Sequence, residues 1–158
     1  RQADAFISIH FNASYFKQAM GTETLFRNNH VLSQLLAASL QRTVSDVLET
    51  IDRGIKVRED LYILRHSTVP TALVEVGFLD HEEEGARFLN AAEREKAAVG
   101  ILLGVERFFA RLAAGDLGEQ DQEDASTGVS KQLLQGKAVE KAKSGQVRED
   151  AAVEQEGP

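Results

Sequence analysis

Two polar side chains lie in segments of this sequence where an apolar run would otherwise continue. His10 directly follows the apolar residues 5–9, and Glu75 lies inside the apolar run 72–79. A carboxylate in such surroundings is desolvated unless a cation, a metal ion or hydrogen-bond donors meet it. The carboxyl end of a strand, where His10 lies, is where α/β sheets usually place their ligand sites. We therefore take His10 and Glu75 as the candidates for chemistry.

Each of these candidates also has a purely structural interpretation, and the residues alone leave it open. His10 could be satisfied by a backbone carbonyl, and Glu75 could form a buried ion pair with Arg58 or Arg65. The remaining histidines lie in polar segments, and we interpret them as structural or solvated residues rather than metal ligands: His30, His66 and His81.

Short segments rich in apolar or β-branched residues predict the strands that carry these side chains. Residues 5–9 form a nearly continuous apolar run, which suits a strand covered on both faces. Residues 22–26 and 72–76 are the other clear strands, and residues 61–64 form a short extended piece. These strands alternate with helical patterns, which indicates a layered α/β domain with helices packed on both faces of the sheet.

Two helices follow from the apolar periodicity. Residues 31–51 carry apolar side chains three or four apart, and Gly54 offers a left-handed turn after them. Asp80 and Asn90 each precede a glutamate by three residues, which is typical of helix N-terminal caps. Asn90 introduces the longer helix, whose predicted buried stripe is Ala98, Ile101, Leu102, Val105, Phe108, Phe109 and Leu112.

Five segments resemble, in order, the motifs of zinc-dependent N-acetylmuramoyl-L-alanine amidases of the family 3 type. The resemblance covers about residues 3–112 and rests on Ala3 to Ala13, Gly21 to Phe26, Arg53 to Lys56, Leu61 to Arg65 and Pro70 to Leu79. It implies an amidase/phosphorylase-hydrolase-like fold and an enzyme that hydrolyses the bond between N-acetylmuramic acid and L-alanine in peptidoglycan. An inactive peptidoglycan-binding or scaffold domain of the same fold is the alternative, and a different zinc peptidase is a weaker one.

The same resemblance assigns roles to individual residues. It implies that His10 is the last of three zinc ligands and that Glu75 is the catalytic carboxylate. The other two ligands, a His and a Glu, are expected upstream of Arg1, so we expect the N-terminal part of the domain to be missing and the fragment alone to be inactive. Asn12 is a weaker candidate, which could contact substrate, orient the loop after His10 or simply be a turn residue. Arg65 is another, which could bind a carboxylate of the stem peptide or only pair with a nearby acidic residue. Glu23 is a candidate acceptor for the second N–H of a ligating histidine.

The resemblance also bears on regulation and solubility. Only a few residues separate Phe26 from the helix that begins at Val31, so we predict no autoinhibitory helical arm between them. Because upstream strands are expected to pair beside the strand that ends at His10, we predict that these 158 residues alone expose a sheet edge. We expect them to be poorly soluble or partly unfolded and to bind zinc weakly.

Composition excludes several classes of partner and site, and it indicates how the chain is divided into domains. A net charge of -7, with Lys and Arg scattered along the chain, argues against a nucleic-acid partner. The absence of cysteine excludes a cysteine zinc site, and no apolar run is long enough for a transmembrane segment. We predict a catalytic part over residues 1–114 and an acidic, disordered tail over 115–158, which has no aromatic residue. A periplasmic or extracellular location in the cell envelope follows from the resemblance.

Overall fold

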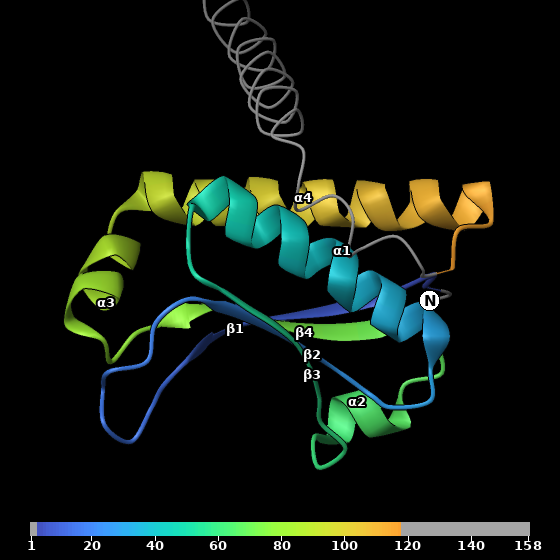
Figure 1. Cartoon of the computed structure of the whole chain (residues 1–158), viewed down its shortest axis with the longest axis horizontal. Coiled ribbons are helices and arrows are strands. Elements are labelled where there is room, and N and C mark those ends of the chain that lie inside the picture. The colour runs from blue at the N-terminus through green and yellow to red at the C-terminus, as the bar shows by residue number, and fades with distance from the viewer. Residues whose placement is uncertain (1–2, 118–158) are drawn as a thin grey trace, which may run out of the picture. The chain divides into compact units, whose positions relative to one another are not determined.

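The computed structural model describes residues 3–117, and the account below concerns these residues (Figure 1). Apart from 115–117, the predicted acidic tail lies outside this range, as do residues 1 and 2. In chain order the elements are β1 (Phe6–Asn12), β2 (Thr22–Phe26), α1 (Val31–Leu48), β3 (Asp52–Val57), α2 (Tyr62–His66), β4 (Thr71–Phe78), α3 (Glu82–Phe88) and α4 (Ala91–Ala114).

The strands form one mixed sheet in the order β1-β4-β2-β3. β1 is parallel to β4, β2 is parallel to β3, and β2 is antiparallel to β4. In this register His10 lies opposite Glu75 on one side of β4, and Glu23 lies opposite Glu75 on the other side. The pairing therefore brings three polar residues from three strands into one row across the sheet.

Helices cover both faces of this sheet, as predicted. α1 and α4 lie on one face, and the short α2 lies on the other (Figure 1). The main core joins Val74 and Val76 of β4 to Leu36 and Leu40 of α1. A smaller core on the opposite face consists of Leu25, Leu64 and Leu73. Because successive strand residues point to opposite faces, Glu75 lies on the face that carries the smaller core.

The contact between α1 and α4 involves two glycines as well as part of the predicted apolar stripe, since Ile101, Val105 and Phe108 pack in the main core. A Cβ atom at Gly104 would lie 2.7 Å from Thr43 Oγ1 and 2.8 Å from the Leu40 Cα, and one at Gly100 would lie 2.9 Å from the Val44 Cα. Thr43 also donates a hydrogen bond to the Gly100 carbonyl at 2.8 Å. The predicted stripe is therefore only partly right, since the following members are exposed: Ala98, Leu102, Phe109 and Leu112.

Two local predictions are wrong around β3 and α2. Residues 52–57 form β3, whereas the sequence suggested a stop after the helix; Gly54 does have a positive φ of 76°, but it lies inside that strand. The left-handed residue that ends α1 is Glu49. Residues 62–66 form a one-turn helix rather than an extended piece. In both cases packing against the sheet decides the local conformation.

Two further predictions need correction, and one is confirmed. β1 is an edge strand in the described sheet, and its side chains are not covered on both faces, since Phe6 is 44% exposed and Ile9, which points to the opposite face, is 56% exposed. His81, not Asp80, caps α3, while the Asp80 carboxylate accepts a hydrogen bond from the Ser14 N–H. Asn90 caps α4 as predicted, because its Oδ1 accepts from the Ala92 N–H at 3.0 Å. Within residues 3–117, no helix has the length and apolar character needed to cross a membrane.

Candidate active site

The row His10–Glu75–Glu23 forms the centre of the candidate site. His10 occupies the carboxyl-terminal half of β1, Glu75 that of the parallel β4, and Glu23 the start of the antiparallel β2. Neighbouring strands lie about 4.8 Å apart, so residues at matched positions present their side chains to the same face at close range. The two candidates predicted from the sequence therefore meet on one face of the sheet.

Glu75 is a half-buried carboxylate whose proton affinity is increased. Burial raises its pKa above the ordinary value; the charge of His10 lowers it, that of Glu23 raises it, and Arg58 makes a smaller opposing contribution. Its Oε2 atom is buried and has no hydrogen-bond partner within residues 3–117. An oxygen in this condition can accept a proton or face a cation.

The structural alternative for Glu75, an ion pair with Arg58 or Arg65, is not formed. Arg58 donates to both carboxylate oxygens of Asp60, at 2.8 and 2.7 Å, and this pairing lowers the Asp60 pKa to about 2. Arg65 lies exposed in the last turn of α2, and its backbone carbonyl accepts a hydrogen bond from Arg27.

His10 lies on the exposed edge strand, where its ring is accessible. Its Nε2 atom is 2.8 Å from the hydroxyl of Ser8, which precedes it by two residues on the same face of β1. This contact holds the ring by one nitrogen and leaves Nδ1 for another partner.

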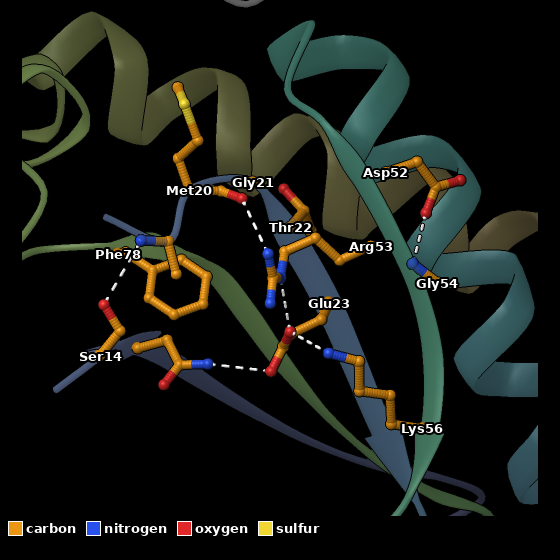
Figure 2. A network of polar contacts seen from close by, with 12 residues as sticks. Ser14, Met20, Gly21, Thr22, Glu23, Asp52, Arg53, Gly54, Lys56 and Phe78 are labelled. Atoms are coloured by element: carbon orange, nitrogen blue, oxygen red, sulfur yellow. Dashed lines mark hydrogen bonds and ion pairs between the residues drawn. The ribbon is translucent and has the colours of Figure 1, made fainter. Parts of the chain in front are cut away.

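Glu23 is the centre of a polar network that joins three strands (Figure 2). Its Oε1 accepts from Asn12 Nδ2 at 3.0 Å, and its Oε2 accepts from Arg53 Nε at 2.7 Å and from Lys56 Nζ at 2.5 Å. Burial alone would raise the Glu23 pKa, but the bonds from Arg53 and Lys56 outweigh it, and the pKa lies below the ordinary value. Glu23 therefore stays ionised beside Glu75.

The structure gives Asn12 a positioning contact. Its Nδ2 donates to Glu23, and its Oδ1 accepts from the Ala13 N–H at 2.8 Å, so both ends of the amide contact the protein. This geometry fixes the start of the loop after β1. These contacts fit an orienting role of Asn12 in this loop, while contact with substrate stays a prediction.

Glu84 holds together the strand ends that carry the two central carboxylates. Its side chain is buried and accepts from the Gly21 N–H at 2.9 Å and from the Phe78 N–H at 2.6 Å. Gly21 directly precedes β2, and Phe78 ends β4. Sequence reasoning missed this residue because it belongs to a run of three glutamates, which is more typical of a solvated surface.

The other histidines have local structural contacts. The Nδ1 atom of His30 accepts from the Ser33 N–H at 3.1 Å and caps α1, and His81 caps α3 in the same way. His66 stacks on Tyr62 with 4.1 Å between the ring centroids. These contacts agree with the interpretation of all three as structural residues.

The described residues supply an incomplete set of metal donors. Within residues 3–117, no group of three or more His, Asp or Glu side chains is arranged to hold a metal ion. The imidazole of His10 and the Oε2 atom of Glu75, which has no hydrogen-bond partner within residues 3–117, are the groups suited to face a metal ion. A metal with three protein ligands would need further donors from outside the part that the structure describes.

Comparison with known proteins gives a consistent set of relatives. The family model described as N-acetylmuramoyl-L-alanine amidase matches residues 1–107. The N-acetylmuramoyl-L-alanine amidase LytC of Bacillus subtilis is 32% identical over 110 residues, which cover 68% of this chain and 22% of that protein. The first curated relatives are matched over 52% and 22% of their own lengths, so this chain spans about half or less of them.

Solved structures show the same similarity. The crystal structure of N-acetylmuramoyl-L-alanine amidase from Clostridium difficile 630 is 35% identical, with a TM-score of 0.64 over 70% of this chain and 59% of that one. The CwlD amidase of Clostridioides difficile, solved in complex with the GerS lipoprotein, is 30% identical, with a TM-score of 0.66 over 68% of this chain and 55% of that one.

Proposed function

Because the chain belongs to the N-acetylmuramoyl-L-alanine amidase family, we propose that its His10–Glu75 pair serves the hydrolysis of the amide bond between N-acetylmuramic acid and L-alanine in peptidoglycan. The observation that carries the proposal is the buried Oε2 of Glu75, which has no hydrogen-bond partner within residues 3–117 and lies opposite a histidine. Such an oxygen is suited to exchange protons with a reacting group.

Glu75 acts as general base and then as general acid. Its carboxylate takes a proton from the attacking water and delivers a proton to the nitrogen of the departing L-alanine, so the products are a muramyl carboxylate and a free peptide amine. A zinc ion held by His10 and by ligands outside the described residues would polarise the amide carbonyl and make the water more acidic. The raised pKa of Glu75 favours the proton transfers.

Glu23 supports this role through its charge. Arg53 and Lys56 keep Glu23 ionised, and the negative charge of Glu23 in turn raises the pKa of Glu75 across the β2–β4 pair. The neighbour thereby increases the basicity of the carboxylate that must accept the proton. Peptidoglycan as substrate places the protein in the cell envelope, on the periplasmic or extracellular side.

The experiment replaces the proposed acid–base group. In the full-length protein, Glu75→Gln removes the proton-accepting oxygen, so we expect the release of free L-alanine amines from muropeptides to fall by about 100-fold or more, with zinc content retained. Glu95→Gln, at an exposed position of α4, is the matched control and should keep full activity. A Glu75→Gln protein that retains the wild-type rate excludes this role. A wild type that binds peptidoglycan without hydrolysing it is instead the inactive binding domain.

A further inference from the structure

We propose that Arg53 and Lys56 bind a carboxylate of the stem peptide and thereby make the site selective for acidic stems. The inference rests on the proposed function, because it concerns the substrate of that same site. It comes from the polar network around Glu23, in which two cationic side chains, Arg53 and Lys56, contact one carboxylate (Figure 2).

Arg53 is held in one orientation by contacts on several sides. Its Nε donates to Glu23 at 2.7 Å, its Nη1 donates to the Met20 carbonyl at 3.4 Å, and its guanidinium lies 5.0 Å from the centre of the Phe78 ring. Nη2 has no hydrogen-bond partner within residues 3–117. A guanidinium that is already oriented loses little conformational freedom when it binds a carboxylate.

Lys56 adds a second cation with donors to spare. Its Nζ contacts Glu23 Oε2 at 2.5 Å, which uses one of the three N–H groups of the ammonium. The Lys56 side chain is 41% exposed, whereas that of Glu23 is 10% exposed. The ammonium can therefore bind an anion from solvent while it keeps Glu23 on its inner side.

Within residues 3–117, Glu23 is the one carboxylate that Arg53 and Lys56 contact, and neither cation contacts Glu75. Two cations, Arg53 and Lys56, share one carboxylate. The next carboxylate on β3, Asp52, faces other partners, since its Oδ1 accepts from Gln41 Nε2 and from the Gly54 N–H. The N–H groups of Arg53 and Lys56 that do not contact Glu23 are available to a carboxylate of the substrate.

The spacing of the strands fits a short stretch of peptide. The cationic groups of Arg53 and Lys56 reach from β3 to Glu23, which lies opposite Glu75 on the neighbouring strand, so they lie about one to two strand spacings from Glu75, roughly 5–10 Å. An extended peptide advances about 3.3–3.6 Å per residue. A stem that crosses the strands from the bond at Glu75 therefore brings its second or third residue to Arg53 and Lys56.

A purely structural role for the network makes a different prediction. If Arg53 and Lys56 only neutralise Glu23, their loss weakens the site for every substrate to the same extent. If they bind a stem carboxylate, their loss weakens the binding of acidic stems more than that of amidated stems. The ratio of the KM values for two substrates that differ in this one group distinguishes the two roles.

The experiment measures that ratio on the full-length protein with muramyl-L-alanyl-D-glutamate and muramyl-L-alanyl-D-isoglutamine, both blocked as γ-methylamides, so that the two substrates differ only in a free or an amidated α-carboxyl group. We expect the wild type to show a KM about tenfold lower for the free acid. Lys56→Met should raise the KM for the acid to near that for the amide, and any change in kcat should be the same on both substrates. Lys56→Arg should preserve the preference. Lys96→Met, which removes a lysine paired to Glu93 on α4 at 2.6 Å, is the matched control and should change neither substrate.

Equal KM values for acid and amide in the wild type, or an equal loss on both substrates in Lys56→Met, would overturn the proposal. Should Lys56→Met fail to fold, the wild type and Lys56→Arg still decide by the presence or absence of the preference. Calorimetric binding of both peptides to Glu75→Gln separates the two proposals. A binding preference without wild-type hydrolysis refutes the proposed function alone, and hydrolysis without a preference refutes the carboxylate subsite alone.

Discussion

Glu75 and Glu23 are adjacent carboxylates whose pKa values move in opposite directions. The first is desolvated and lacks a hydrogen-bond partner at Oε2 within the described residues, whereas the second receives three donors from β1 and β3. The burial of Glu75 outweighs the favourable charge of His10, and the donors to Glu23 outweigh its burial. The two environments favour the uptake of a proton by Glu75 and a fixed negative charge on Glu23.

The lowered pKa of Glu23 predicts how stability depends on pH. Because the pKa of Glu23 is lower in the folded protein than its ordinary value of 4.5, its ionisation stabilises the fold above pH 4.5, and this contribution is lost as the pH falls through the folded pKa. We expect Glu23→Gln to lower the free energy of unfolding by about 1–3 kcal/mol at pH 7, since Arg53 and Lys56 lose their acceptor.

Urea denaturation between pH 3 and pH 7 provides the measurement. The difference between wild type and Glu23→Gln should shrink as the pH falls below about 4.5. Glu59→Gln, at an exposed position, should follow the wild-type curve. A Glu23→Gln difference that stays constant down to pH 3 would show that the charge of Glu23 does not stabilise the fold.

At the scale of single residues, the sequence identifies polar residues that interrupt or end an apolar run. It misses residues whose hydrogen-bond partners lie far away in the sequence. Glu75 and His10 are visible because each interrupts or ends an apolar run. The network of Glu23 depends on Arg53 and Lys56 of β3, a strand that the sequence did not predict. Glu84 depends on two backbone N–H groups from β4 and from the start of β2.

At the scale of elements, α3 connects the helical layer to the strands of the site. Its first turn carries Glu84, which accepts hydrogen bonds from Gly21 and Phe78, and its last residue, Phe88, packs into the main core. A Cβ at Gly77 would lie 2.4 Å from the Phe88 ring, so β4 and α3 approach closely. The positions of Glu23 and Glu75 thus depend on α3. Its Glu84 side chain contacts the ends of their strands and neither of the two carboxylates themselves.

Glu84→Ala tests this connection. The substitution leaves the Gly21 and Phe78 N–H groups without their acceptor in a buried place, so we expect a loss of about 2–4 kcal/mol in the free energy of unfolding and a lower kcat. Chemical denaturation and muropeptide hydrolysis measure the two effects. Glu83→Ala, exposed in the same turn, should stay within about 0.5 kcal/mol of wild type. A stable Glu84→Ala protein would show that α3 does not hold these strand ends.

The elements predicted correctly are those with a strong local pattern. β2 and β4 have dense β-forming segments, and α1 and α4 have long apolar periodicity. β3 and α2 were missed because neither has such a pattern: β3 starts with Asp52-Arg53-Gly54, and α2 is five residues long. Their conformations follow from pairing with β2 and from the burial of Leu64 against Leu25 and Leu73.

For the molecule as a whole, the edge strand β1 is the most exposed part of the described sheet. Phe6 is 44% exposed and Ile9 is 56% exposed, and the backbone groups on the free side of β1 have no neighbouring strand within residues 3–117. An edge with apolar side chains is a template for pairing with another chain. The sequence-based expectation of an exposed sheet edge agrees with this arrangement, whereas poor solubility stays a prediction.

The 158-residue chain should therefore associate with itself as its concentration rises. Ile9→Lys places a charge on the free edge, which opposes strand pairing, so we expect a smaller associated fraction in sedimentation velocity experiments. Leu89→Lys, at a residue that is 82% exposed between α3 and α4, is the control for the added charge and should associate as the wild type does. A monodisperse wild type at high concentration would contradict the prediction.

The order of the strands also determines when His10 and Glu75 come together during folding. His10 and Glu75 face each other only because β4, late in the chain, inserts between β1 and β2. Contacts between such distant segments form slowly and late, after the entropy of closing the intervening loop has been overcome. A nascent chain thus exposes β1 and β2 before β4 arrives, and His10 and Glu75 do not meet until β4 has paired with both strands.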